Sequence, residues 1–141
     1  MVMENSYALI TGASSGIGLE IAKDLAGRGY NLILTARRTE LLESISKEIS
    51  EANNVNVDLI SKDLSNYDAP REIFEFCESK NYKVDILINN AGYGIKTSFH
   101  QTSIEDEEAF IRVLGTSVIM LTKLFIPKML SNGSGNVMIV C

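Results

Sequence analysis

The 141-residue sequence predicts an α/β fold in which a parallel sheet is doubly wound by helices. Short apolar runs with few polar breaks alternate with segments of helical spacing, a pattern typical of buried parallel strands separated by covering helices. Glycines, arginines and amides also follow several of these runs directly, at residues 11–18, 36–38, 63 and 89–92. Because ligands bind at the carboxyl ends of such strands, the sequence predicts a ligand site at one edge of the sheet.

The first strand and helix surround a glycine-rich turn. An apolar run at 7–10 stops at Thr11–Gly12, and helical spacing runs from Gly16 to about Gly29, where Arg28–Gly29 is a C-terminal signal. The residues predicted to share one side of this helix are Ile17, Ile21, Ala22, Leu25 and Ala26.

The middle of the chain repeats the unit twice. A second strand at 32–34 precedes a helix from Thr39, its predicted N-cap, to about Ala52. A third strand at 55–60 precedes a helix over 67–79, with Pro70 in its first turn. The predicted buried face of the first of these helices comprises Leu41 or Leu42, Ile45 and Ile49.

The last third contains the longest predicted helix. It follows a fourth strand at 84–88, begins after the N-cap Ser103 and closes by Met129–Leu130. A fifth strand starts at Asn136, and the sequence ends at Cys141, still within it. We therefore expect one incomplete domain over residues 1–141. The predicted apolar stripe of the long helix comprises Ile104, Ile111, Leu114, Val118, Leu121 and Phe125.

Composition narrows the function classes. The net charge of −5 argues against nucleic-acid and anionic-membrane binding. No stretch matches the roughly 18 apolar residues of a membrane span, and residues 1–6 lack the features of a secretory signal. Two cysteines are too few for a disulfide framework or a cysteine metal site. We expect a cytoplasmic location and no metal centre.

The glycine turn has the chemistry of a phosphate site. Gly12, Gly16 and Gly18 allow close backbone approach, and the helix start offers unpaired N–H groups and a positive dipole end. The spacing differs from Gly-x-Gly-x-x-Gly, and the Lys-Ser/Thr of a P-loop is missing, which argues against nucleotide triphosphate hydrolysis. Alternatively, the turn only closes a strand against a helix.

Two arginines follow the second strand. Arg37 and Arg38 lie about twenty residues past the turn, and Ala36 occupies the position where NAD enzymes carry a carboxylate. An arginine fork can hold a 2′-phosphate by charge-assisted hydrogen bonds. We expect NADP rather than NAD; the alternative is that both arginines only solvate a loop.

Two further strand ends carry polar groups. Buried amides are costly unless paired, so Asn89–Asn90 predicts a bracket between neighbouring strand ends, and Ala91–Gly92 leaves room for a ligand. Asp63 is either a turn or N-cap residue or an acceptor for an adenine amino group. We interpret His100 as a surface residue and Cys77 as a packing residue.

These motifs together resemble a known family. The segment Thr11-Gly12-Ala13-Ser14-Ser15-Gly16-Ile17-Gly18, with Asn89-Asn90-Ala91-Gly92 downstream, is similar to the short-chain dehydrogenases/reductases across essentially the whole chain. The resemblance implies a Rossmann-type NAD(P)-binding fold with the turn on the pyrophosphate and Asp63, with Leu64, at the adenine. It also implies that Asn89–Gly92 lies beside the nicotinamide ribose and that Arg37 selects NADP.

The same resemblance indicates which catalytic residues of the family this sequence does not contain. The family's catalytic Ser and Tyr-x-x-x-Lys would follow Cys141, and alignment of residues 121–129 puts Leu114 at the position of its catalytic Asn, although Leu114 also fits a core position. We therefore assign no catalytic residue to this chain. The resemblance implies reversible hydride transfer between the nicotinamide and the carbon of a small carbonyl or alcohol substrate, and a homo-oligomeric full-length form. The alternatives are a non-catalytic nucleotide-binding module, such as a truncated or decayed copy, and a methyltransferase-like protein, against which Ala36–Arg37 and Asn89–Gly92 speak.

Overall fold

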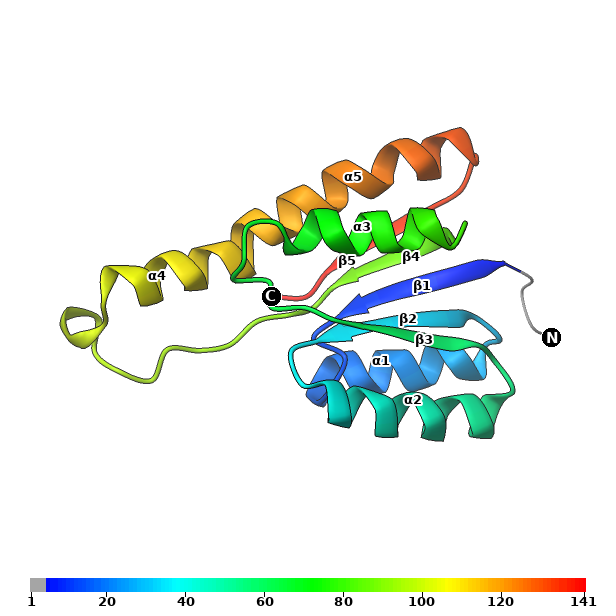
Figure 1. Cartoon of the computed structure of the whole chain (residues 1–141), viewed down its shortest axis with the longest axis horizontal. Coiled ribbons are helices and arrows are strands. Elements are labelled where there is room, and N and C mark those ends of the chain that lie inside the picture. The colour runs from blue at the N-terminus through cyan, green and yellow to red at the C-terminus, as the bar shows by residue number, and fades with distance from the viewer. Residues whose placement is uncertain (1–4) are drawn as a thin grey trace.

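A five-stranded parallel sheet forms the centre of the computed structural model, which describes residues 5–141 (Figure 1). All four neighbouring strand pairs are parallel, so the predicted α/β sheet is confirmed. Residues 1–4, on which the expectation about a secretory signal rests, lie outside the described residues. In spatial order the strands are β3 (Val57–Ser61), β2 (Asn31–Ala36), β1 (Ser6–Thr11), β4 (Lys83–Asn89) and β5 (Asn136–Ile139).

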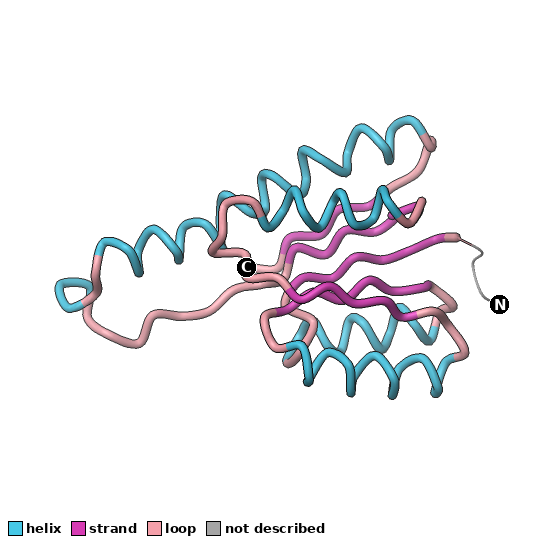
Figure 2. The backbone as a smooth tube through the Cα atoms, in the orientation of Figure 1, coloured by secondary structure: helices cyan, strands magenta, loops and turns pink. Residues whose placement is uncertain are grey.

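Helices cover both faces of this sheet, as Figures 1 and 2 show. One buried cluster joins the sheet to α1 (Gly16–Gly27) and α2 (Thr39–Asn53). A second cluster joins the opposite face to α3 (Ala69–Ser79) and α5 (Ser117–Ser131). The chain moves outward from β1 to β3 in one direction and then from β4 to β5 in the other. The carboxyl ends of β1 and β4 therefore form the switch point at which doubly wound sheets bind ligands.

Six predicted element starts shift by one or two residues, among them those of α2, α3 and β3. Thr39 is the first residue of α2 and not its N-cap, because Arg38 has the extended cap conformation. The third helix begins at Ala69, which leaves Tyr67 outside it and 65% exposed. β3 begins at Val57, although Val55 before it is buried. Such shifts are common because propensity hardly constrains helix and strand ends.

The long helix is interrupted, and its predicted apolar stripe is only partly right. It consists of α4 (Ile104–Ile111), a π-helical turn η2 (Arg112–Thr116) and α5, preceded by the short 3₁₀ turn η1 (Phe99–Gln101). The predicted N-cap is confirmed, since the Ser103 hydroxyl accepts a hydrogen bond from the Asp106 N–H. The buried residues recur every four positions: Val113, Ser117, Leu121, Phe125 and Met129.

Three residues of the predicted stripe are exposed instead. Ile104, Ile111 and Leu114 are 75%, 61% and 42% exposed. Helix α4 extends beyond the sheet in Figure 1, so its apolar positions have no strand beneath them. The π turn also adds a residue between α4 and α5, which shifts the helical phase relative to a regular 3.6-residue period.

The apolar composition of this helix also contradicts one expectation. By length and composition the stretch Ile104–Ser131, with a mean hydropathy of 1.8, is sufficient to cross a membrane, contrary to the reading of the sequence. The core helix of a globular protein has the same composition, and α5 packs with α3 against the sheet.

Candidate functional site

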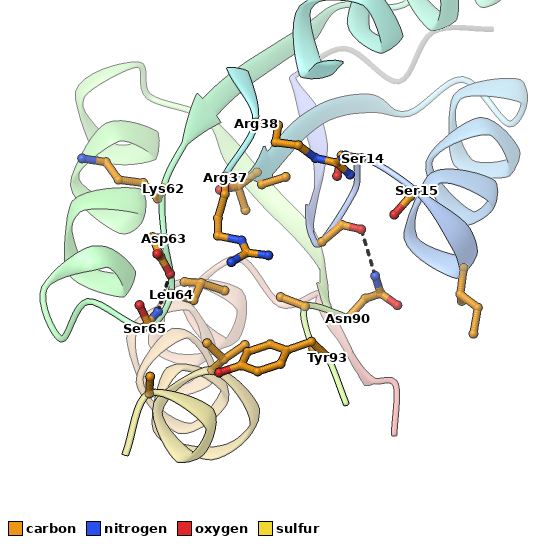
Figure 3. Close-up of a pocket in the computed structure, with 18 residues that line it drawn as sticks. Ser14, Ser15, Arg37, Arg38, Lys62, Asp63, Leu64, Ser65, Asn90 and Tyr93 are labelled. Carbon is orange, nitrogen blue, oxygen red and sulfur yellow. Dashed lines mark hydrogen bonds between the residues drawn. The ribbon is translucent and has the colours of Figure 1, made fainter. Parts of the chain in front are cut away.

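A cavity of about 490 Å³ opens at the carboxyl ends of the first four strands (Figure 3). Its volume lies within the range of small-molecule and cofactor sites. Segments far apart in sequence meet in it, from the turn after β1 to helix α4. It is lined by Gly12, Ser14, Ser15, Ile17, Thr35, Ala36, Arg37, Arg38, Lys62, Asp63, Leu64, Ser65, Asn90, Ala91, Gly92, Tyr93, Ala109 and Val113.

The turn after β1 requires glycine at three positions for two different reasons. Gly12 and Gly16 have positive φ angles of 64° and 57°, which side chains disfavour. A Cβ on Gly12 would lie 2.8 Å from the Ala91 Cα, and one on Gly18 would lie 2.4 Å from the Asn90 Nδ2. The missing side chains at Gly12 and Gly18 therefore let the turn pack against the segment after β4. Close approach of the turn to a bound group stays a prediction.

The start of α1 is open toward the cavity. Its N-cap Ser15 makes no side-chain capping hydrogen bond, and the first turn carries no acidic residue. The first N–H groups of a helix have no partner within the helix, and the dipole is positive at this end. Ser14 and Ser15 line the same cavity. Backbone donors, hydroxyls and dipole together suit a phosphate group.

The amide bracket predicted between strand ends is confirmed. The Asn90 side-chain Nδ2 donates to the Thr11 and Gly12 carbonyls, at 3.1 and 3.2 Å. In return, the Thr11 Oγ1 accepts hydrogen bonds from the Asn90 and Ala91 backbone N–H groups, both at 2.9 Å. Asn89 is buried and points the other way, donating to the Thr122 hydroxyl of α5 at 3.3 Å. These contacts fix the distance between the glycine turn and the segment Ala91–Gly92.

Arg37 and Arg38 both line the cavity and are exposed. In Figure 3 the Arg37 guanidinium points toward the centre of the residues drawn, whereas Lys62 points away from it. Lys62 is paired with Glu72, but neither arginine forms an ion pair within residues 5–141. Ala36 also lines the cavity, so the residue that ends β2, directly before the two arginines, carries no carboxylate. This edge of the cavity therefore offers two guanidinium groups that form no ion pair with the described residues.

Asp63 has the turn role that the sequence left open, and its role as an acceptor for an adenine amino group stays a prediction. Its Oδ1 accepts a hydrogen bond from the Ser65 backbone N–H at 2.9 Å, which is a turn contact. It also lines the cavity, next to Leu64, which is buried at 7% exposure. The carboxylate is thus part of the cavity wall.

Most of the predicted site residues meet in the cavity, but four do not line it. Thr11 and Gly18 lie beneath the turn, Gly16 is exposed beside it, and Asn89 faces α5. Sequence reasoning missed six residues of the lining other than Ala36. Thr35 could have been found because it continues a strand whose end was already assigned, whereas the others come from loops and from a helix placed by the fold. The missed residues are Thr35, Lys62, Ser65, Tyr93, Ala109 and Val113.

Three isolated predictions can be placed as well. Leu114 is 42% exposed and is not a core residue; its Cδ2 lies 2.8 Å from where a Cβ on Gly92 would stand. Cys77 is buried in the core, which confirms its packing role, and burial raises the pKa of its thiol to about 12. His100 is exposed in η1, away from the cavity lining.

Comparison with curated proteins gives relatives that share oxidoreductase names. The chain is 35% identical over 133 residues to a very-long-chain 3-oxoacyl-CoA reductase of Kluyveromyces lactis, covering 89% of this chain and 37% of the relative. It is 30% identical over 135 residues to an uncharacterized oxidoreductase of Staphylococcus saprophyticus, covering 96% of this chain and 58% of the relative. The chain therefore spans between about a third and three fifths of the length of these relatives.

Solved structures show the same fold over nearly the whole chain. A short-chain dehydrogenase from Sphingobium yanoikuyae in complex with NADPH matches with a TM-score of 0.88 and 30% identity, covering 95% of this chain and 52% of that one. L-sorbose reductase from Gluconobacter frateurii, complexed with NADPH and L-sorbose, matches with a TM-score of 0.90 and 29% identity, covering 99% and 53%.

A family model described as short chain dehydrogenase matches residues 6–141. That match takes in the glycine turn, the two arginines and the amide bracket. The chain belongs to the short-chain dehydrogenase/reductase family of oxidoreductases, of whose members it represents the cofactor-binding part.

Proposed function

We propose that this chain is the NADP(H)-binding portion of an oxidoreductase that transfers a hydride between the cofactor and a carbonyl or alcohol substrate. The observation that carries the proposal is the pairing of the uncapped start of α1 with Arg37 and Arg38 in one cavity. The first feature suits a pyrophosphate and the second suits a 2′-phosphate. Both relatives whose structures were compared were solved with NADPH.

The cavity fits the dinucleotide chemically at each end. Gly12 lines the cavity without a side chain, so a pyrophosphate can approach the backbone there. The Asp63 carboxylate can accept from an adenine amino group, with Leu64 supplying an apolar surface beside it. Ala91 and Gly92 leave the opposite end open for the nicotinamide ribose.

The chain's own residues bind and orient the cofactor. The amide bracket of Asn90 and Thr11 fixes the spacing between the pyrophosphate end and the ribose end of the cavity, so the ligand meets a preformed site. The nicotinamide supplies the hydride when bound. By the resemblance, the residues that transfer the proton lie in the part of the relatives that this chain does not match. The proposed substrate is a small carbonyl or alcohol compound.

The test is the selectivity between NADPH and NADH. A charge-assisted hydrogen bond contributes about 1.5–3 kcal/mol, so the arginines should favour NADPH by about 10- to 100-fold. Arg37→Asp should weaken NADPH binding by at least that factor and leave NADH binding within about twofold. The fluorescence of the reduced cofactor gives the dissociation constants, and the chain contains no tryptophan that would contribute to the signal. Equal losses for both cofactors would remove the 2′-phosphate role. Arg28→Asp, at the C-cap of α1 and outside the cavity lining, serves as a charge-matched control.

A further inference from the structure

Tyr93 is an aromatic residue that lines the cavity. It follows Gly92 directly, at the end of the segment that leaves β4, and it lines the same cavity as the glycine turn and Arg37. Its side chain is 41% exposed although it stands at the cavity wall. Figure 3 shows its ring extending among the residues that line the cavity, on the side of Leu64 and Asn90. An aromatic face is therefore available to a bound molecule.

The ring of Tyr93 is held by a second ring. Tyr93 and Phe110 of α4 meet edge to face, with ring centroids 5.4 Å apart and an interplanar angle of 74°. This is a favourable aromatic geometry, which contributes about 0.5–1.5 kcal/mol beyond burial. Ala109 and Val113, the neighbours of Phe110 on the helix, also line the cavity. Phe110 thus reaches the cavity only through the ring that it supports.

A second contact at the same place keeps the helix in register. The Leu114 side chain packs so closely on Gly92 that a Cβ there would lie 2.8 Å from its Cδ2. The residue lies within the π turn η2, which sets the phase between α4 and α5. Contacts from two successive turns of the helix therefore fix the short segment Gly92–Tyr93, and the Tyr93 ring is preorganised before any ligand binds.

We propose that Tyr93 binds a planar ring of the dinucleotide by stacking, and that Phe110 is the positioning residue that holds the Tyr93 ring at the cavity wall. The inference rests on the proposed function, because it takes the ligand to be NADP(H). Stacking needs the aromatic ring and not the hydroxyl, and a held ring loses little conformational freedom on binding. Adenine and nicotinamide are the two planar rings that the ligand offers.

The experiment compares five variants for their binding of two ligands, NADPH and 2′,5′-ADP. The second ligand contains the adenine ring but no nicotinamide ring. Tyr93→Leu should weaken NADPH binding by about three- to tenfold, whereas Tyr93→Phe should stay within about twofold. Phe110→Leu should weaken NADPH binding by about two- to fivefold, whereas Phe110→Tyr, which keeps the aromatic ring, should retain the affinity of the wild type. Phe99→Leu is the matched control, because Phe99 is 81% exposed in η1 and lies outside the cavity lining.

The two ligands separate the possible outcomes. Loss for both NADPH and 2′,5′-ADP identifies adenine as the stacked ring, and loss for NADPH alone identifies nicotinamide; either result supports the inference. Tyr93→Leu binding as tightly as the wild type overturns it, and so does Phe110→Tyr behaving like Phe110→Leu. If the wild type binds neither ligand, the proposed function fails and takes this inference with it. Thermal unfolding of each variant, monitored by circular dichroism, verifies that the sheet has formed.

Discussion

Two threonines at paired positions of the sheet should respond in opposite ways to the same substitution. Thr11 of β1 and Thr35 of β2 are partners in the parallel register, and both are 1% exposed. The Thr11 Oγ1 accepts two backbone hydrogen bonds of 2.9 Å, from Asn90 and Ala91. Within residues 5–141, the Thr35 Oγ1 is buried and has no hydrogen-bond partner. Valine has nearly the shape of threonine without the hydroxyl, so it isolates the oxygen at each site.

The expected magnitudes follow from what each oxygen leaves behind. Thr11→Val leaves two backbone N–H groups without an acceptor, at about 1–3 kcal/mol each, so the free energy of unfolding should fall by about 2–6 kcal/mol. Thr35→Val removes a buried hydroxyl that pairs with nothing, so the free energy of unfolding should stay the same or rise by about 1 kcal/mol. Thr11→Ser keeps the oxygen and loses one methyl group, at a cost of about 1 kcal/mol.

Urea unfolding followed by circular dichroism measures all three variants against the wild type. The reasoning requires Thr11→Val to be the least stable and Thr35→Val the most stable. It would be refuted if Thr35→Val were as destabilising as Thr11→Val, or if Thr11→Ser lost as much as Thr11→Val. The first result would mean that the unpaired hydroxyl of Thr35 is not a cost to the fold, and the second that the Thr11 oxygen does not hold the segment after β4 in place.

Stability should also decline at high pH and depend on glycine packing in α1. Burial, with a smaller effect of Glu78, raises the pKa of Cys77 from 9.0 to about 12, and burial with the hydrogen bond to Asp58 raises that of Tyr82. Because the folded chain keeps protons that the unfolded chain releases, the contribution of Cys77 to stability is constant below pH 9 and falls above it by about 1.4 kcal/mol per pH unit, and that of Tyr82 falls only above pH 10. Cys77→Ala should therefore show a shallower slope in urea titrations between pH 8 and 10.5. Gly18→Ala should cost about 1–3 kcal/mol, because a Cβ would lie 2.4 Å from the Asn90 Nδ2 and 2.5 Å from the Gly12 carbonyl oxygen. Gly27→Ala on the same helix should be neutral or stabilising, since a Cβ there would lie 3.8 Å from the Asn53 Oδ1, an ordinary contact distance. Equal melting temperatures for both variants would contradict the packing argument.

The sequence predicts the parts of the site that depend on local patterns. Uninterrupted apolar runs identify the buried parallel strands, and glycines, arginines and amides directly after them mark one edge of the sheet. Thr11, Arg37 and Asn90 could therefore be grouped before any coordinates, because parallel strands all bring their carboxyl ends to the same edge. The bracket between strand ends also follows from a local rule, namely that a buried amide needs partners.

What the sequence does not predict depends on tertiary geometry. The spacing of Ile104, Ile111 and Leu114 fits a buried stripe, but burial also requires a surface opposite the helix, and α4 extends past the sheet. The π turn at Arg112–Thr116 changes the helical phase without any glycine or proline signature strong enough to announce it. Tyr93 was missed for the same reason, since its role follows from the distance to Phe110, seventeen residues later in the sequence.

The preference for NADPH over NADH is the most direct measurement of the central claim, that Arg37 and Arg38 and the start of α1 form one dinucleotide site. Dissociation constants of the wild-type chain for the two reduced cofactors, determined side by side, should differ by about 10- to 100-fold in favour of NADPH. Binding of both cofactors with equal affinity, or of neither, would contradict the claim.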